Sequence, residues 1–162
     1  IEIGKPEDQK ATKILVVEDL DSPRDIICSF IEAKGFSNVI GVSSAEEALK
    51  HLRNSPEEFA CVISDIRMPN MNGKEFVEEV RNSKDIQKVP VIMLTAYSSV
   101  DTLIDCLKSG ATGFLVKPPK ISDLHREIGR ALRLRARSLD PRLASPDEAE
   151  GLREVLIDKG FS

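Results

Sequence analysis

Short apolar runs alternate with amphipathic segments through most of this chain, and that alternation limits the folds open to it more than any other feature. Such runs lie at residues 14–17, 61–64, 91–94 and 114–116, and a further strand fits residues 38–42. They are rich in β-branched residues and bounded by turn residues, as buried parallel strands are. Five strands alternating with five helices between residues 13 and 137 predict an α/β fold, a parallel sheet with helices on both faces.

Several of the expected helices have recognisable start signals. Ser22 followed by Pro23 fits an N-cap and a proline in the first turn. Ser44 and Glu47 have the spacing of a capping box. Ser122 is the expected N-cap of the last helix of the alternating pattern. These residues predict where the helices begin.

The two ends of the chain fall outside the alternating pattern. Residues 1–12 are polar and predict a flexible lead-in, residues 13–137 form the expected main domain, and residues 138–162 are an extension. The extension begins as a linker with a Leu-Asp-Pro break at 139–141. Ser145 then starts an amphipathic helix whose expected inner face carries Ala149, Leu152, Val155 and Leu156.

Composition excludes several classes of protein. A net charge of −4 over 162 residues argues against nucleic-acid binding by this segment, and no apolar run approaches the roughly 20 residues that cross a membrane. Cys28, Cys61 and Cys106 are far apart and form no C-x-x-C pair, so we expect small buried side chains in a reducing compartment, the cytoplasm. Because the chain begins at Ile1 rather than methionine, we expect a trimmed or expressed fragment.

Polar residues follow the expected strands directly. Glu18 and Asp19 follow the first strand, Asp65 the third, Thr95 the fourth and Lys117 the fifth. In an open α/β sheet, ligands bind beyond the carboxyl ends of the strands, where the strand order reverses. Three carboxylates, a hydroxyl and an ammonium are therefore expected at one edge of the sheet.

This set of groups suits a divalent metal ion and a phosphoryl group. Hard cations such as Mg²⁺ prefer oxygen ligands, which Asp19 and Asp65 offer directly and Glu18 directly or through water. A carboxylate can also act as a nucleophile and form an aspartyl phosphate. Asp65 could attack, while Lys117 pairs with the phosphoryl charge and Thr95 donates its hydroxyl. Any one of these residues could instead be a helix cap or turn residue, but four strand ends together favour the site.

At this point the sequence resembles a known family, the receiver domain of two-component response regulators, as in the chemotaxis regulators. The resemblance runs from about residue 13 to residue 137. The motifs that carry it are residues 16–19, the acidic pair after the first strand, residues 64–73 around Met68-Pro69, residues 94–96, residues 110–111 and residues 117–118.

The resemblance implies both a fold and a set of roles. The fold is flavodoxin-like, a doubly wound five-stranded sheet of order 2-1-3-4-5. Asp65 would be the phosphoacceptor, Thr95 and Lys117 would bind the phosphoryl group, and Phe114 would act with Thr95 as the switch aromatic. The peptide bond after Lys117 would be cis. Mg²⁺ would lie among Glu18, Asp19, Asp65 and the backbone carbonyl of Arg67.

Some positions depart from the family pattern or vary within it. Glu18 stands where an aspartate is usual, and Pro119 stands where an aromatic residue usually follows Lys-Pro. Arg67 and Tyr97 each lie two residues past a site residue, where they can line the path of the hydrolytic water. We expect the bulky Tyr97 ring to impede water and lengthen the phosphorylated state; the alternative is an ordinary exposed aromatic.

The resemblance also implies partners. A histidine kinase or phosphotransfer protein would donate the phosphoryl group, and a downstream domain or protein would read the result. The expected reading surface comprises residues 98–109, 112–116 and 122–137. The last segment is rich in arginine, which suits a homodimer, an acidic partner or simply a solvated helix face. The chain would not be an enzyme beyond promoting its own phosphorylation and dephosphorylation.

Two alternatives remain open at the sequence level. One is a phosphatase resembling the haloacid-dehalogenase family, with Asp19 as nucleophile, because residues 19–22 mimic its first motif. A second acidic pair after a late strand and a lid domain are missing, and Asp65 would have no role. The other is a degenerate receiver that serves only as a scaffold, which the intact set of site residues disfavours.

Overall fold

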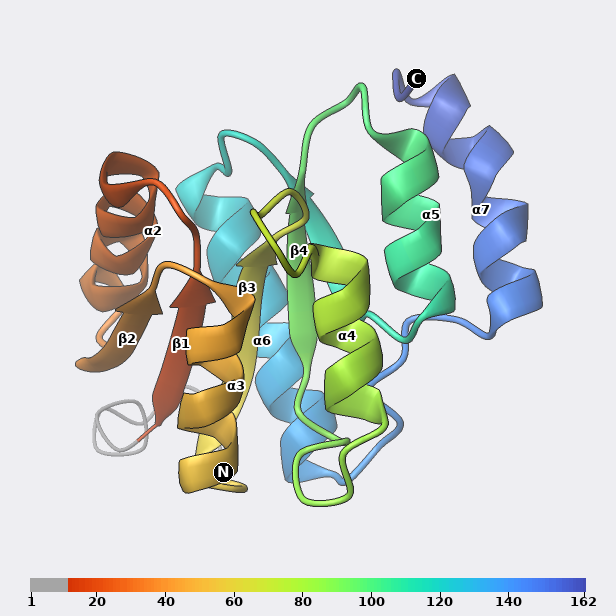
Figure 1. Cartoon of the computed structure of the whole chain (residues 1–162). Coiled ribbons are helices and arrows are strands. Elements are labelled where there is room, and N and C mark those ends of the chain that lie inside the picture. Colours follow the sequence, from red (N-terminus) through yellow and green to blue (C-terminus); the bar gives the residue numbers. More distant parts are fainter. Residues whose placement is uncertain (1–11) are drawn as a thin grey trace.

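The computed structural model describes residues 12–162, and these form one parallel sheet with helices on both sides (Figure 1). The elements are β1 (Lys13–Val17), α2 (Asp21–Ala33), β2 (Asn38–Val42), α3 (Ala45–Asn54), β3 (Phe59–Asp65), α4 (Gly73–Arg81), β4 (Val91–Thr95), α5 (Val100–Lys108), β5 (Gly113–Val116), α6 (Ile121–Ala136) and α7 (Pro146–Asp158). The strand order β2-β1-β3-β4-β5 confirms the predicted fold class. The lead-in expected over residues 1–12 lies, apart from Thr12, outside the described residues.

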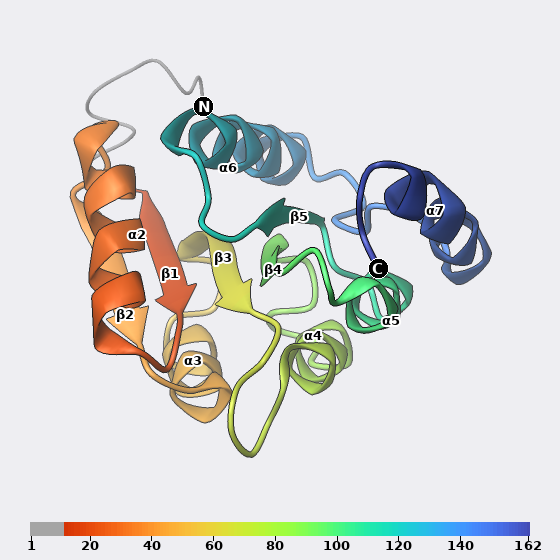
Figure 2. The ribbon, with the colours of Figure 1, turned by 90° about the horizontal axis from the view of Figure 1, so that it is seen from above.

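Helices cover both faces of the sheet, which buries the strands as their apolar runs predict (Figure 2). Helices α2 and α6 cover one face, where Ile27, Ile31, Leu124 and Ile128 are buried. Helices α3, α4 and α5 cover the other face. The helix α7 is outside both layers, alongside α5.

Two helix starts differ from the prediction for the same reason. The helix α2 begins at Asp21 and α6 at Ile121, each one residue before the serine expected to cap it. The amide of Arg24 donates to the carbonyl of Leu20, and that of Leu124 to the carbonyl of Lys120, so the first turn closes earlier. Ser22 and Ser122 are therefore first-turn residues and not N-caps. In both helices the start is set by a backbone hydrogen bond and not by a capping serine side chain.

The capping box predicted at Ser44 and Glu47 is only half formed. The side chain of Ser44 accepts a hydrogen bond from the amide of Glu47, as an N-cap should. The Glu47 carboxylate, however, accepts from the hydroxyl of Ser43 and does not return to the N-cap amide. A complete capping box is found instead at Asn72 and Glu75, at the start of α4.

The helix predicted after Ser145 is present as α7 and starts with a capping box of Ser145 and Glu148. Its inner face differs in part from the prediction. Ala149 and Leu156 are buried and Leu152 is half-buried, but Val155 is 46% exposed and is not part of the apolar core. The buried apolar face of α7 is therefore narrower than the sequence pattern predicted.

The side chain of Arg81 ties together the end of the domain opposite the strand-end polar residues. Its guanidinium is buried and donates to the carbonyl oxygens of Gly110 at 2.8 Å, Val89 at 2.6 Å and Gln87 at 3.0 Å. Burial lowers the pKa of Arg81 to about 10, still far above neutrality. A buried charge with several acceptors joins the end of α4 to the loops before β4 and β5.

The three cysteines are unpaired, and two of them are buried as predicted. Cys61 and Cys106 are buried, whereas Cys28 on α2 is only half-buried. Burial raises the pKa of the first two thiols to about 12 and that of Cys28 to about 11. Among the residues described, no helix combines the length and apolar character needed to cross a membrane.

Candidate functional site

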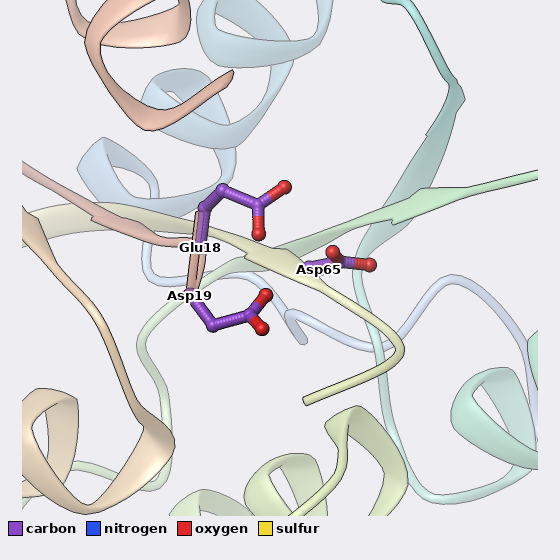
Figure 3. A group of neighbouring side chains, drawn as sticks. All are labelled: Glu18, Asp19 and Asp65. Atoms are coloured by element: carbon purple, nitrogen blue, oxygen red, sulfur yellow. The ribbon is translucent and has the colours of Figure 1, made fainter. Parts of the chain in front are cut away.

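Three carboxylates meet at the edge of the sheet where β1 and β3 end (Figure 3). Glu18 and Asp19 follow β1, and Asp65 is the last residue of β3. One carboxylate oxygen from each lies within 4.8 Å of the other two. The parallel register, which pairs Val17 with Ser64, brings these strand ends level. Glu18 is 2% exposed and Asp65 5%, so the charges are held largely out of water.

The ammonium of Lys117 joins this cluster from the end of β5. Its Nζ lies 2.5 Å from Oδ2 of Asp65 and 3.8 Å from Oε1 of Glu18. The backbone amide of Lys117 donates to the carbonyl of Thr95 at 2.8 Å, which fixes where the side chain starts. The Lys117–Pro118 peptide bond is cis, as the resemblance implied.

The loop after Asp65 folds back tightly onto the strand ends. The amide of Arg67 donates to Oδ1 of Asp65 at 3.2 Å, and the amide of Gly73 to the carbonyl of Ile66 at 2.8 Å. A Cβ at Gly73 would lie 2.7 Å from Cε of Met93 and 2.8 Å from Cα of Ile66. Only glycine allows the backbone to approach this closely, and the approach positions the loop beside Asp65.

The electrostatics of the cluster favour a cation. The pKa of Glu18 is raised to about 7 because burial removes water from the carboxylate and because Asp19 and Asp65 lie close by; Lys117 opposes the shift. Three carboxylates face one ammonium, so full ionisation leaves excess negative charge. All three offer hard oxygen donors, and this set suits a hard divalent cation rather than a soft metal.

Thr95 lies at the end of β4 and is buried. Its hydroxyl donates to the carbonyl of Ala96 at 3.2 Å. The neighbouring β5 carries Phe114, which is half-buried; Tyr97 is 52% exposed.

Two contacts near the cluster were not predicted. The guanidinium of Arg67 donates to the hydroxyl of Ser99 at 3.2 Å, so this side chain reaches the start of α5. The ring of Phe161, from the turn after α7, packs against Tyr97 and Phe114 with centroid distances of 5.0 Å and 6.0 Å. The sequence does contain one relevant signal, since Phe161 is an apolar residue that follows the helix-ending Gly160. That signal does not predict which surface the Phe161 ring contacts.

Comparison with known proteins points to one family. The family model described as "Response regulator receiver domain" matches residues 14–129. The two-component response regulator ORR11 of Oryza sativa is 33% identical over 119 residues, which cover 74% of this chain and 80% of that protein. The chemotaxis protein CheY-3 of Vibrio cholerae is 28% identical over 121 residues, which cover 75% and 92%. The family match ends before α7 begins.

Solved structures agree with the sequence comparisons. The chemotaxis response regulator CheY4 of Vibrio cholerae superposes with a TM-score of 0.67 and 33% identity, covering 75% of this chain and 98% of that one. A response regulator receiver domain protein from Clostridium thermocellum gives a TM-score of 0.73 at 29% identity, covering 79% and 99%. Sequence and fold therefore indicate the same family.

Proposed function

The chain belongs to the response regulator receiver family, and we propose that it acts there as a phosphorylation-dependent switch with Asp65 as the phosphoacceptor. The contact of 2.5 Å between Lys117 and Asp65, beside the acidic pair, is the observation that carries this assignment. Nothing in the comparisons supports the haloacid-dehalogenase alternative with Asp19 as nucleophile; the family model that matches is the receiver model.

Asp65 receives the phosphoryl group from a phosphohistidine of a histidine kinase or a phosphotransfer protein. The P–N bond breaks as a P–O bond forms on the carboxylate, and the imidazole nitrogen keeps the electron pair. Lys117 balances the charge that the phosphoryl group adds. Glu18, Asp19, Asp65 and the backbone carbonyl of Arg67 would hold Mg²⁺, which would supply further charge neutralisation.

Thr95 and Phe114 convert this local event into a surface change. The phosphoryl oxygens draw the Thr95 hydroxyl away from the carbonyl of Ala96, its acceptor at 3.2 Å. The movement frees space beside β4, and the Phe114 ring turns inward to fill it. The surface of α5, β5 and α6 changes, which is the kind of two-state response that a local charge event can bias.

A downstream domain or protein reads this surface, and α6 is the proposed contact for a homodimer. Three of its arginines are engaged within the chain: Arg126 with Asp123, Arg130 with Glu127 and Thr112, and Arg135 with the carbonyl of Glu57. Arg133 and Arg137 form no ion pair with another described residue. We expect the switch to work in the cytoplasm, where its three thiols stay reduced, and this segment not to bind nucleic acid.

Labelling with acetyl phosphate and Mg²⁺, followed by intact mass measurement, tests the assignment. The wild-type chain should gain one phosphoryl group, Asp65→Asn should gain none, and Asp85→Asn, which changes an exposed aspartate elsewhere, should label normally. Continuous release of phosphate that depends on Asp19, with no label on Asp65, would support the phosphatase and overturn the proposal.

A further inference from the structure

The helix α7 covers the outer surface of α5, part of the surface expected to be read by partners (Figures 1 and 2). Ala149, Leu156 and Phe161 are buried and join the same apolar core as Leu103 and Leu107 of α5. Two ion pairs flank this contact, Arg153 with Asp101 and Lys108 with Glu150, the latter at 2.7 Å. The sequence predicted residues 98–109 as part of an open reading surface, and α7 covers part of that surface, although the Asp101 side chain stays exposed.

The turn after α7 is attached to the parts that move in the proposed switch. Phe161 is 5% exposed, and its ring packs between those of Tyr97 and Phe114. The amide of Ser162 donates to the carbonyl of Tyr97 at 2.8 Å, and the amide of Val100 donates to the carbonyl of Ser162 at 3.1 Å. Phe161 and Ser162 therefore contact both the switch aromatic Phe114 and the loop that follows Thr95.

We propose that residues 145–162 are an internal cover of the α5 surface that phosphorylation of Asp65 releases. This inference rests on the proposed function. In the present state the Phe114 ring supports Phe161, and the loop after Thr95 supplies the acceptor for Ser162. When Thr95 turns toward the phosphoryl group and Phe114 turns inward, both supports shift, and the cover loses its anchoring contacts. The freed surface of α5 then becomes available to a partner.

Linkage makes the proposal reciprocal. If phosphorylation weakens docking of the cover by some factor, docking must weaken binding of a phosphoryl group or its mimic by the same factor. Couplings between sites are typically about 5- to 150-fold. Loosening the cover by mutation should therefore raise the affinity for a phosphoryl mimic without any change at Asp65.

The first test measures amide hydrogen exchange over residues 145–162 of the full chain, with Mg²⁺ alone and with Mg²⁺ plus beryllofluoride as the phosphoryl mimic. Exchange of the α7 amides and of Ser162 should become at least about tenfold faster when the mimic binds, as a population shift toward the released state requires. Asp65→Asn should show no such change under the same conditions. Unchanged or slower exchange over α7, in wild-type chains saturated with the mimic, overturns the proposal.

The second test measures the affinity for beryllofluoride by calorimetry. Phe161→Ala should bind it at least about fivefold more tightly than the wild type, and Arg153→Gln should shift in the same direction. The matched control is Ile157→Ala, since that α7 side chain is 48% exposed, and its affinity should stay within about twofold of wild type. Equal affinities in all four proteins overturn the proposal.

The outcomes separate this inference from the proposed function. If wild-type chains do not bind the mimic, the assignment of Asp65 fails and the released cover fails with it. If the mimic binds and depends on Asp65 while α7 stays protected, only the inference fails. Tyr97 is the single tyrosine of a chain without tryptophan, so its fluorescence follows docking of Phe161 independently.

Discussion

Protonation of Glu18 affects the stability of the metal-free protein. Its pKa is raised from 4.5 to about 7 by burial and by the neighbouring carboxylates, so the folded state holds this proton more tightly than the unfolded chain. The contribution to stability is fully present below pH 4.5 and is lost as the pH rises to about 7. It amounts to at most about 3 kcal/mol.

Urea unfolding in EDTA at pH 5 and pH 8 checks this contribution. The wild type should lose stability between the two values, and Glu18→Gln, which carries no titrating group there, should lose less by up to about 3 kcal/mol. Mg²⁺ should remove most of the difference by balancing the carboxylates. An identical pH dependence in both proteins contradicts the assignment of the shift to Glu18.

The Tyr97 ring is expected to restrict the access of water to phosphorylated Asp65. We expect Tyr97→Ala to shorten the lifetime of phosphorylated Asp65 a few-fold, because water then reaches the acyl phosphate more easily. Tyr97→Phe keeps the ring and should keep the lifetime. Release of phosphate from labelled chains measures both. If the alanine variant dephosphorylates at the wild-type rate, the ring does not restrict water.

At the scale of elements, the close packing of the loop after β3 makes a sharp prediction. Gly73→Ala places a methyl group within 2.8 Å of the backbone of Ile66, so the loop or α4 must shift, and we expect a loss of about 1–3 kcal/mol in urea unfolding. Gly151→Ala on α7 is the matched control. Beyond the adjacent backbone of α7 itself, no atom lies within 4 Å of its added Cβ, so stability should rise by about 0.5–1 kcal/mol. Equal effects would contradict the packing argument.

The elements also show what the sequence could predict. The strand ends, and with them Asp65 and Lys117, followed from apolar runs and from the rule that parallel strands end at one edge. The exact starts of α2 and α6 could not be predicted, because a backbone hydrogen bond begins each helix one residue before Ser22 or Ser122. The amphipathic pattern of α7 indicated that it needs a partner surface, but nothing local specified α5.

Long-range polar contacts were equally hidden from the sequence. In the sequence, Arg81 looks like an ordinary charged residue of an exposed helix face. It is buried in the structure because carbonyl groups from distant loops accept hydrogen bonds from its guanidinium. The pairing of Arg67 with Ser99 likewise depends on two loops that meet only in the folded chain. The periodicity of apolar residues predicts the buried faces of helices and the ends of strands. It does not predict which side chains form contacts between distant elements.

At the scale of the whole molecule, the packed core should protect the thiols. With pKa values of about 11 to 12, at most about one thiol in a thousand is ionised at pH 8. We expect Ellman's reagent to react slowly, and only with the half-buried Cys28, in the native protein, and to titrate all three thiols in denaturant. Cys28→Ser should abolish the native reaction. Rapid reaction of Cys61 or Cys106 in the native state would show that the core opens.

The position of α7 along α5 has a consequence for competition. A helix tethered by a short linker acts at an effective concentration on the order of millimolar. A separate partner at micromolar concentration, seeking the same surface, faces a competitor about a thousandfold more concentrated. It gains access only by binding more tightly by that factor, or when the tethered helix is loosened. The linker over residues 137–145 thus helps to set the threshold for output, and lengthening it should lower that threshold while leaving Asp65 untouched.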